Sequence, residues 1–322
     1  MPNINGLAKP AEPASFALMV CTYDRPRLFS EFIAALRQMA IPTAVSFTLI
    51  VSDNNPRPQF DSYIGALLDS LPFATLYGHE SAVGYSNARN KALAMALQTD
   101  AELLGFCDDD LFVGKDWLIG HLRSYHEFQC DGVTGAIHIS GAVSQQKYRG
   151  GHGQRRAQTG MGNFSFKRRW ISKDGHNLRF DANCNKTGFE DQCFTRKAGS
   201  LGEVIIFSDY PVVYDHFDSP ADYQAELRNK AEVAALAQRN KVVALRHSRQ
   251  YGKVALAMLR GLIYGLKSIG HHLAALFHLL TRNHQLQLKE QVAATKELLK
   301  MTECLKGLFG DIVPRQKRRR NH

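Results

Sequence analysis

Short apolar runs alternate with helix-like segments through the first 110 residues, and this alternation constrains the fold more than any other feature of the chain. The apolar runs, which we interpret as buried strands, cover residues 16–21, 47–51, 74–77 and 103–107. The segments between them, with apolar residues at helical spacing, cover residues 27–39, 59–71 and 86–97. Strands that alternate with helices in this way predict a parallel sheet with helices on both faces.

The pattern changes after residue 110. We predict further helices at residues 117–128 and 190–197, and further strands at residues 132–139, 164–166 and 203–207. Residues 140–162 are rich in Gly, Gln, Arg and Ser and show little periodicity, so we predict a mobile loop that acts as a lid over a site. The second half is therefore expected to complete the same α/β domain.

The composition is that of a globular protein, since 44% of the 322 residues are hydrophobic and 22% are charged. The six cysteines are scattered without a Cys-x-x-Cys pair, which excludes a disulfide framework and a zinc site of that spacing. This use of cysteine is typical of a reducing compartment. The polar N-terminus has no apolar core of signal-peptide length. We therefore predict a cytoplasmic protein.

The positive charge is concentrated at the C-terminal end. Residues 241–322 contain sixteen Lys and Arg against four Asp and Glu, a net charge of +12. Because the whole chain carries +10, the first 240 residues carry −2. This asymmetry predicts three parts: a flexible N-terminus at residues 1–14, a catalytic domain at 15–240 and a basic helical appendage at 241–322.

Asp108, Asp109 and Asp110 directly follow the fourth apolar run. Three adjacent carboxylates repel one another unless a positive charge lies between them. A hard divalent cation, held by one or two carboxylates together with substrate phosphates, would supply that charge. The carboxyl ends of strands are also where ligands bind in open α/β sheets. A solvated acidic turn is the alternative that the triplet alone leaves open.

Polar residues also follow the other early strands, and in a parallel sheet these loops converge on one edge. Thr22 and Tyr23 follow the first strand, Asp53 follows the second, and Arg89 opens the helix after the third. An arginine at a helix N-terminus suits a phosphate, and a carboxylate can accept hydrogen bonds from a base or ribose. Together they predict a nucleoside-diphosphate site, although each residue alone also has a structural interpretation as a turn residue, a surface charge or a packed ring.

The loop after the first strand, CTYDRPRL, contains no glycine. A nucleotide-sugar pyrophosphorylase would carry a Gly-rich phosphate loop there, and a Rossmann dehydrogenase would carry G-x-G-x-x-G, so both classes are disfavoured. A nucleic-acid-binding protein would account for the basic C-terminal end. It would not account for the acids of the body, which repel phosphates unless a metal is bound.

The order of several segments resembles the inverting family-two glycosyltransferases of the GT-A fold. The segments are ALMVCTYDRP, LIVSDNN, GYSNARNKAL, GFCDDDLF, GNFSFKRRW, LRFDANCNKTGFEDQCFTRKA and VVYDHF. The acid triplet matches the DxD element of the family, and Gly-Phe-Glu-Asp at residues 188–191 matches its Glu-Asp element. The resemblance implies a GT-A nucleotide-diphospho-sugar transferase fold over residues 15–216, followed by the helical appendage.

The resemblance also implies a role for each matching residue on the donor side. Thr22 and Tyr23 would line the nucleotide base, Asp53 would contact it, and Arg89 would approach the nucleotide. Asp108 would lie near the ribose and the metal, and Asp110 would coordinate a Mn²⁺ or Mg²⁺ ion. His216 lies where many members place a further metal ligand.

On the acceptor side, Asp191 matches the catalytic base of the family, and Glu190 would help to orient the acceptor. Arg168 and Arg169 match an arginine pair that lies beside the acceptor, with a solvated position as the equal alternative. The implied reaction is metal-dependent, inverting transfer of a sugar from a nucleoside-diphosphate donor, a UDP-sugar, to a hydroxyl of a glycan or lipid-linked acceptor. Such an enzyme would serve surface polysaccharide or lipopolysaccharide synthesis. A non-catalytic protein that binds nucleotide sugars or polyanions such as nucleic acid is the alternative.

The appendage predicts a long amphipathic helix. Residues 246–282 contain no proline, and on a helical wheel their cations form a narrow stripe beside a wide apolar face. Such a helix suits the plane of an anionic membrane surface, which would place the protein on the inner face of the cytoplasmic membrane. Packing of the apolar face on the body, or in a homodimer, is the alternative.

Overall fold

The computed structural model describes residues 15–141, 145–146, 151–187, 189–219, 221–229, 231–232, 235, 239, 251–280 and 284–309. The chain forms two compact units. The first comprises Met1–Ala182 with Glu190–Phe217, and the second comprises Asn183–Phe189 with Asp218–His322. The predicted domain boundary at residues 240 and 241 lies outside the described residues, as does the predicted N-terminal segment at residues 1–14.

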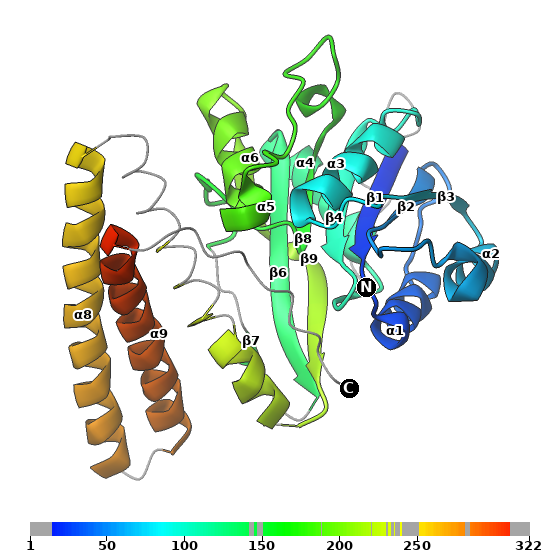
Figure 1. The fold of residues 1–322 in the computed structure, drawn as a ribbon. Helices are drawn as coiled ribbons and strands as arrows, with labels where there is room; N and C mark the ends of the chain where they lie inside the picture. Colours follow the sequence, from blue (N-terminus) through cyan, green and yellow to red (C-terminus); the bar gives the residue numbers. More distant parts are fainter. Residues whose placement is uncertain are drawn as a thin grey trace. The chain divides into compact units, whose positions relative to one another are not determined.

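The first half of the first unit alternates strands and helices as predicted (Figure 1). Its elements are β1 (Ser15–Thr22), α1 (Pro26–Arg37), β2 (Ser46–Asp53), the π-helical turn η2 (Phe60–Ile64), α2 (Gly65–Asp69), β3 (Ala74–His79), α3 (Tyr85–Ala96) and β4 (Leu103–Asp108). Helix α1 shows how the local sequence determines where a helix forms. Its first residue is Pro26, and its buried apolar residues recur at helical spacing.

The second half has a different composition of elements. They are β5 (Phe112–Val113), α4 (Trp117–Phe128), β6 (Gly132–Gly141), β7 (Gln145–Gln146), β8 (Asn163–Lys167), the 3₁₀ turn η3 (Arg168–Trp170), α6 (Glu190–Ser200) and β9 (Ile205–Phe217). Strand β9 is much longer than predicted, and β5 was not predicted. The predicted lid at residues 140–162 lies partly in β6 and β7, and residues 142–144 and 147–150 lie outside the described part.

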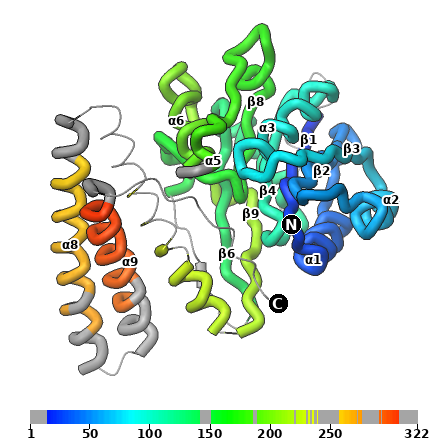
Figure 2. The backbone as a smooth tube through the Cα atoms, in the orientation of Figure 1, coloured from blue at the N-terminus to red at the C-terminus, as the bar shows by residue number. Residues whose placement is uncertain are grey.

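The strands form one mixed sheet in the order β3-β2-β1-β4-β8-β6-β9-β5, with β7 beside β6. The first four strands are parallel, as predicted. Strand β8 is antiparallel to both β4 and β6, whereas β6 and β9 run parallel and side by side (Figures 1 and 2). The antiparallel pairing of β6 and β8 has a physical reason. Parallel neighbours need a crossover connection, usually a helix, and no helix occurs in the described residues between β6 and β8.

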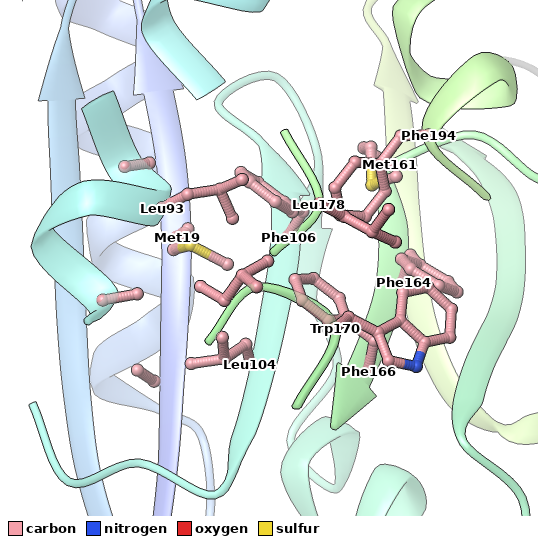
Figure 3. Close-up of a cluster of buried hydrophobic side chains, with 14 of the residues drawn as sticks. Met19, Leu93, Leu104, Phe106, Met161, Phe164, Phe166, Trp170, Leu178 and Phe194 are labelled. Carbon is pink, nitrogen blue, oxygen red and sulfur yellow. The ribbon is translucent and has the colours of Figure 1, made fainter. Parts of the chain in front are cut away.

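Two apolar clusters pack the two faces of the sheet. The first includes side chains of α3 and α6, and ten of its residues are labelled in Figure 3. The second includes side chains of α1, α2 and α4. Met19 of β1 lies in the first cluster and its neighbour Leu18 in the second, because successive side chains of a strand point to opposite faces. The prediction of helices on both faces of an α/β sheet is therefore confirmed.

The register of β4 and β8 fixes which residues lie at each edge of the sheet. Asn163, at the start of β8, pairs with Cys107 at the carboxyl end of β4. Lys167, at the other end of β8, pairs with Leu103 at the amino end of β4. The residues just before β8 therefore lie at the edge of the acid triplet, and the residues just after β8 lie at the opposite edge.

The second unit contains α5 (Cys184–Thr187), which was not predicted, and two long helices, α8 (Tyr251–Leu280) and α9 (His284–Phe309), that pack along each other (Figure 1). The side of α8 that faces α9 includes several small residues, together with larger ones such as Tyr264. Ser268 Oγ donates to the Ala294 carbonyl oxygen at 2.8 Å, and a Cβ on Gly261 would lie 3.3 Å from Cys304 Cβ. In the described part, no helix is both long enough and apolar enough to span a membrane.

Candidate active site

The acid triplet ends β4 at the carboxyl edge of the sheet, and Arg25 neutralises part of it. Arg25 Nη1 donates to Asp109 Oδ1 at 3.0 Å and to Asp110 Oδ2 at 3.1 Å. Burial raises the pKa of Asp109 to about 6; Arg25 opposes this rise, and Asp110 adds to it. Asp109 therefore lies inside the protein beside the guanidinium of Arg25. The side chains of Asp108 and Asp110, in contrast, remain 49% and 19% exposed.

Arg89 of α3 joins two carboxylates that are far apart in sequence. Its Nη1 donates to Glu190 Oε1 at 2.7 Å, and its Nη2 lies 3.7 Å from Asp108 Oδ1. The guanidinium is buried and lies 5.6 Å from the ring centroid of Phe180. In this structure Arg89 is therefore engaged with carboxylates inside the protein, and its predicted contact with a nucleotide stays a prediction.

Glu190 and Asp191 form the first turn of α6, where the helix dipole favours negative charge. Glu190 is only 3% exposed, and among the described residues its Oε2 has no hydrogen-bond partner. A buried charged oxygen without a partner costs free energy that a bound hydroxyl can restore. Burial is also the main cause that raises the pKa of Asp191 to about 6; Arg89 lowers this pKa and Glu190 raises it.

Asp53 is held within the protein by four hydrogen bonds. Its Oδ1 accepts from the Asn55 backbone N at 3.0 Å and from Asn55 Nδ2 at 2.6 Å. Its Oδ2 accepts from the Gln59 backbone N and from Tyr77 Oη, both at 2.7 Å. The side chain is fully buried. Because a carboxylate has about four lone-pair sites, a base can reach Asp53 only if one of these donors is displaced.

Thr22 and Tyr23 lie at the end of β1, where the sequence predicts the base-binding loop. Thr22 is buried and pairs in register with Asp53 of β2. Tyr23 is half-buried. The structure therefore brings Thr22, Asp53 and Asp108 to one edge of the sheet, as the parallel register requires.

His216 lies near the end of β9, opposite Ser140 of β6. Its Nδ1 is 3.2 Å from Ser140 Oγ, and its ring lies edge-on to Phe112, with centroids 6.3 Å apart. Among the described residues, no group of three or more His, Cys, Asp or Glu side chains is placed to hold a metal ion. The structure does not bring His216, Asp108 and Asp110 into one coordination sphere, so the role of His216 stays a prediction.

Arg168 and Arg169 lie at the opposite edge of the sheet, because β8 is antiparallel to β4. Arg168 donates to four carbonyl oxygens at and after the end of α3, including that of Thr99 at 2.6 Å. Arg169 donates to both carboxylate oxygens of Glu203, at 3.0 and 2.8 Å. The structure thus places both arginines outside the candidate site, in structural contacts that their sequence match does not reveal.

The acid triplet fits a hard divalent cation by the chemistry of its donors. Mg²⁺ and similar ions commonly take one or two carboxylates and complete their shell with substrate phosphates and water, so a protein cage of three ligands is not required. Asp108 and Asp110 are the partly exposed carboxylates at this edge. These two residues could hold such an ion. The positive charge of Arg25, which contacts Asp110, would affect how tightly the ion binds.

Arg25 is a site residue that the sequence analysis did not single out. The only signal was its position in the loop after the first strand, three residues beyond Thr22. An arginine in a loop is usually a solvated charge, so its pairing with Asp109 and Asp110 becomes evident only once β1 and β4 are placed side by side.

The model of glycosyl transferase family 2 matches residues 17–195. No curated protein matches the chain significantly. Among solved structures, TarS residues 1–349 from S. aureus is similar over 88% of this chain and 90% of that chain, with 17% identity and a TM-score of 0.48. The complex of the same TarS fragment with UDP-GlcNAc gives 16% identity and a TM-score of 0.49 over the same shares. The family match spans more than half of the chain and includes the acid triplet and the Glu-Asp pair, so the chain belongs to glycosyl transferase family 2 and has its GT-A fold.

Proposed function

We propose that this glycosyltransferase moves a sugar from a UDP-sugar to a hydroxyl of a glycan or lipid-linked acceptor, with inversion, in surface polysaccharide or lipopolysaccharide synthesis. The observation that carries the proposal is the link through Arg89, which holds Asp108 on the donor side and Glu190 beside Asp191 on the acceptor side. A single displacement needs both groups close together, because the sugar passes directly from one to the other.

In this proposal Asp191 is the general base. A base works best when its pKa is near the working pH, and burial raises the pKa of Asp191 to about 6. Glu190 would accept a hydrogen bond from the acceptor through its Oε2, which has no hydrogen-bond partner in the part of the chain that the structure describes. Arg89 would fix the carboxylate of Glu190 in position, since their contact of 2.7 Å is buried.

The departing nucleoside diphosphate would lie at the acid triplet. Asp108 and Asp110 would hold a Mn²⁺ or Mg²⁺ ion there, which when bound neutralises the growing charge of the diphosphate. Arg25 would keep Asp109 and Asp110 in place through its two contacts. His216 as a further ligand, and Thr22, Tyr23 and Asp53 at the base, remain parts of the proposal.

A panel of nucleotide sugars, each with and without Mn²⁺, tests the proposal. We expect one UDP-sugar to be hydrolysed or transferred, and excess chelator to remove the activity. Asp110→Ala is expected to lower Mn²⁺ affinity about 10- to 100-fold, a range typical for perturbed metal sites. Mn²⁺ binding in the presence of UDP, followed by electron paramagnetic resonance, measures this directly.

Asp174→Ala is the matched control, because Asp174 is exposed and lies outside the candidate site. Full activity in excess chelator would rule out the metal requirement. Binding of an oligonucleotide, with no response to any nucleotide sugar, would favour the non-catalytic alternative.

We also propose that α8 binds an anionic membrane surface. Small residues of α8, including Gly261, Gly265 and Ser268, lie against α9, and several large aliphatic residues of α8 are exposed. The exposed residues are Leu259, Leu262, Ile263, Leu266, Ile269 and Leu273. Small residues between helices, with large aliphatic ones outside, are typical of membrane environments. Residues 251–280 also contain no Asp or Glu, which suits an anionic leaflet better than a mixed-charge protein surface.

Leu266→Glu tests this surface, because Leu266 is 69% exposed and the substitution does not touch the contact with α9. We expect binding to phosphatidylglycerol vesicles to fall about 10- to 100-fold, given the transfer free energy of one leucine. Gln291→Glu on α9 adds the same charge at an exposed polar position and should bind normally. Equal sedimentation of both variants with vesicles would contradict the proposal, and concentration-dependent dimerisation lost in Leu266→Glu would identify a second copy as the occupant.

A further inference from the structure

A group of rings lies on one face of the sheet where β5, β9 and β6 run side by side. Phe112 of β5 pairs in register with Tyr214 of β9, and Tyr214 pairs in register with His138 of β6, so these three residues form one row across the strands. His216 lies two residues further along β9 and points to the same side, because alternate residues of a strand share a face. We call this surface, defined by Phe112, His138, Tyr214 and His216, the ring face.

The ring face looks to the side of the sheet that carries the proposed acceptor groups. Val113 and Val213, which precede or follow the ring residues in sequence, lie in the second core cluster with side chains of α1 and α4. The rings therefore point to the opposite side, where the first cluster packs side chains of α3 and α6. Phe112 follows Asp110 by two residues, so their Cα atoms are at most about 7 Å apart. The ring face thus begins next to the acid triplet.

The rings are open to solvent because β6 and β9 extend past their neighbour β8. Strand β8 pairs with β6 only over residues 132–134, whereas β6 and β9 stay paired to residues 141 and 217 (Figure 1). Tyr214 is 39% exposed, His216 is exposed, and Phe112 and His138 are half-buried. Single exposed rings are common on protein surfaces, but adjoining ones are typical of a binding surface.

The rings also hold one another in place. The rings of His138 and Tyr214 meet edge to face, with centroids 5.9 Å apart and planes at 82°. Those of Phe112 and His216 lie 6.3 Å apart at 64°, and His216 Nδ1 is 3.2 Å from Ser140 Oγ. A ligand that stacks on rings fixed in this way loses little binding free energy to their ordering.

The charge of the ring face selects the kind of ligand. Among the described residues 112–113, 136–141 and 212–217, the only Asp, Glu, Lys or Arg is Asp215, which is 1% exposed and points to the opposite side of β9. A nucleic acid or another phosphate-rich polymer would need cations here. Rings interspersed with hydroxyl and imidazole groups instead suit a neutral pyranose, whose C–H face stacks on a ring while its hydroxyls form hydrogen bonds.

We propose that the ring face binds the sugar chain of a neutral glycan acceptor, with pyranose rings stacked on Phe112 and Tyr214. The proposal rests on the proposed function and specifies its acceptor as an uncharged glycan chain rather than a phosphate-rich one. Contacts with sugar residues away from the reacting hydroxyl would hold the acceptor in position for transfer.

Tyr214→Thr is the decisive variant, because it removes the ring but keeps a hydroxyl and the strand preference of the position. Neutral tetrasaccharides of hexoses and of N-acetylhexosamines are titrated into the full chain without a donor, and saturation-transfer NMR measures the Kd. We expect the wild type to bind at least one of them, and Tyr214→Thr to raise its Kd about tenfold, as the loss of one stacked ring implies. Tyr214→Phe keeps the ring and should stay within about twofold of the wild type.

Tyr210→Thr is the matched control on the same strand, because Tyr210 Oη donates to Glu127 Oε2 of α4 at 2.7 Å, away from the ring face. It should bind the tetrasaccharide like the wild type. Absence of binding to every tetrasaccharide, or equal Kd values for the wild type and Tyr214→Thr, would overturn the inference. Self-association that is lost in Tyr214→Thr would also overturn it, by identifying a second copy as the occupant.

The same variants separate this inference from the proposed function. If the wild type turns over a UDP-sugar and Tyr214→Thr binds the tetrasaccharide normally, only the ring face as a glycan site is refuted. If tetrasaccharide binding depends on Tyr214 but no UDP-sugar is hydrolysed or transferred, the proposed function fails and the glycan site stands.

Discussion

Asp191→Asn is expected to lower kcat about 10³-fold, within the range usual for loss of a general base, while UDP affinity stays near that of the wild type. The amide has the same shape as the carboxylate and can still accept the backbone hydrogen bond from Gln192, which is 2.6 Å long. It cannot accept a proton from the acceptor hydroxyl. Steady-state kinetics together with calorimetric titration of UDP separate the two effects.

The pH profile of the wild type gives an independent check on the same residue. Asp191 must be deprotonated to act as a base, and its pKa is raised to about 6, so kcat/KM should rise with pH up to about 6 and then level off. Asp174→Asn is the matched control and should leave both kcat and the profile unchanged. Turnover of Asp191→Asn at the wild-type rate would show that another group accepts the proton.

Arg89→Met is expected to destabilise the protein by about 3–5 kcal/mol, the cost of removing one partner of a buried ion pair. Both partners are buried, since Arg89 is 8% and Glu190 is 3% exposed. The substitution removes the contact of 2.7 Å and leaves the carboxylate of Glu190 without a counter-ion. Urea denaturation measures the change in the free energy of unfolding.

A double-mutant cycle shows whether the pair itself is responsible. Glu190→Gln in the Arg89→Met background should restore part of the lost stability, because a neutral amide is cheaper to bury than an unpaired carboxylate. Purely additive losses would mean that Arg89 stabilises the protein through other contacts. If Arg89→Met folds, the acidic limb of its pH profile should move to higher pH, because Arg89 lowers the pKa of Asp191.

The early strands could be located from the sequence because each carries its own signal. The apolar run at 103–107 predicted β4, and the observed strand extends it by one residue, Asp108. Burial on both faces of a parallel sheet requires a run of this kind, so the pattern and the position agree. The antiparallel insertion of β8 left no such mark. The alternation of apolar and polar residues in this five-residue strand is the same whether the strand runs parallel or antiparallel to its neighbours.

That insertion decides the position of the arginine pair. From the sequence alone, Arg168 and Arg169 could be assigned to the acceptor, because they match an arginine pair that the family places beside the acceptor. Once β8 runs against β4, they lie at the other edge, and Arg169 pairs with Glu203, 34 residues away. Strand direction is a property of the whole sheet and has no local signature.

The sequence by itself determined the α/β class, the four parallel strands and the residues at their carboxyl ends, because apolar periodicity and the connection between strand ends and loops are local. Only the tertiary structure decided the partners of these residues: Arg25 on Asp109, and Arg89 between Asp108 and Glu190. These contacts join segments up to 101 residues apart. The effect of a charged side chain depends on the groups that the fold brings beside it.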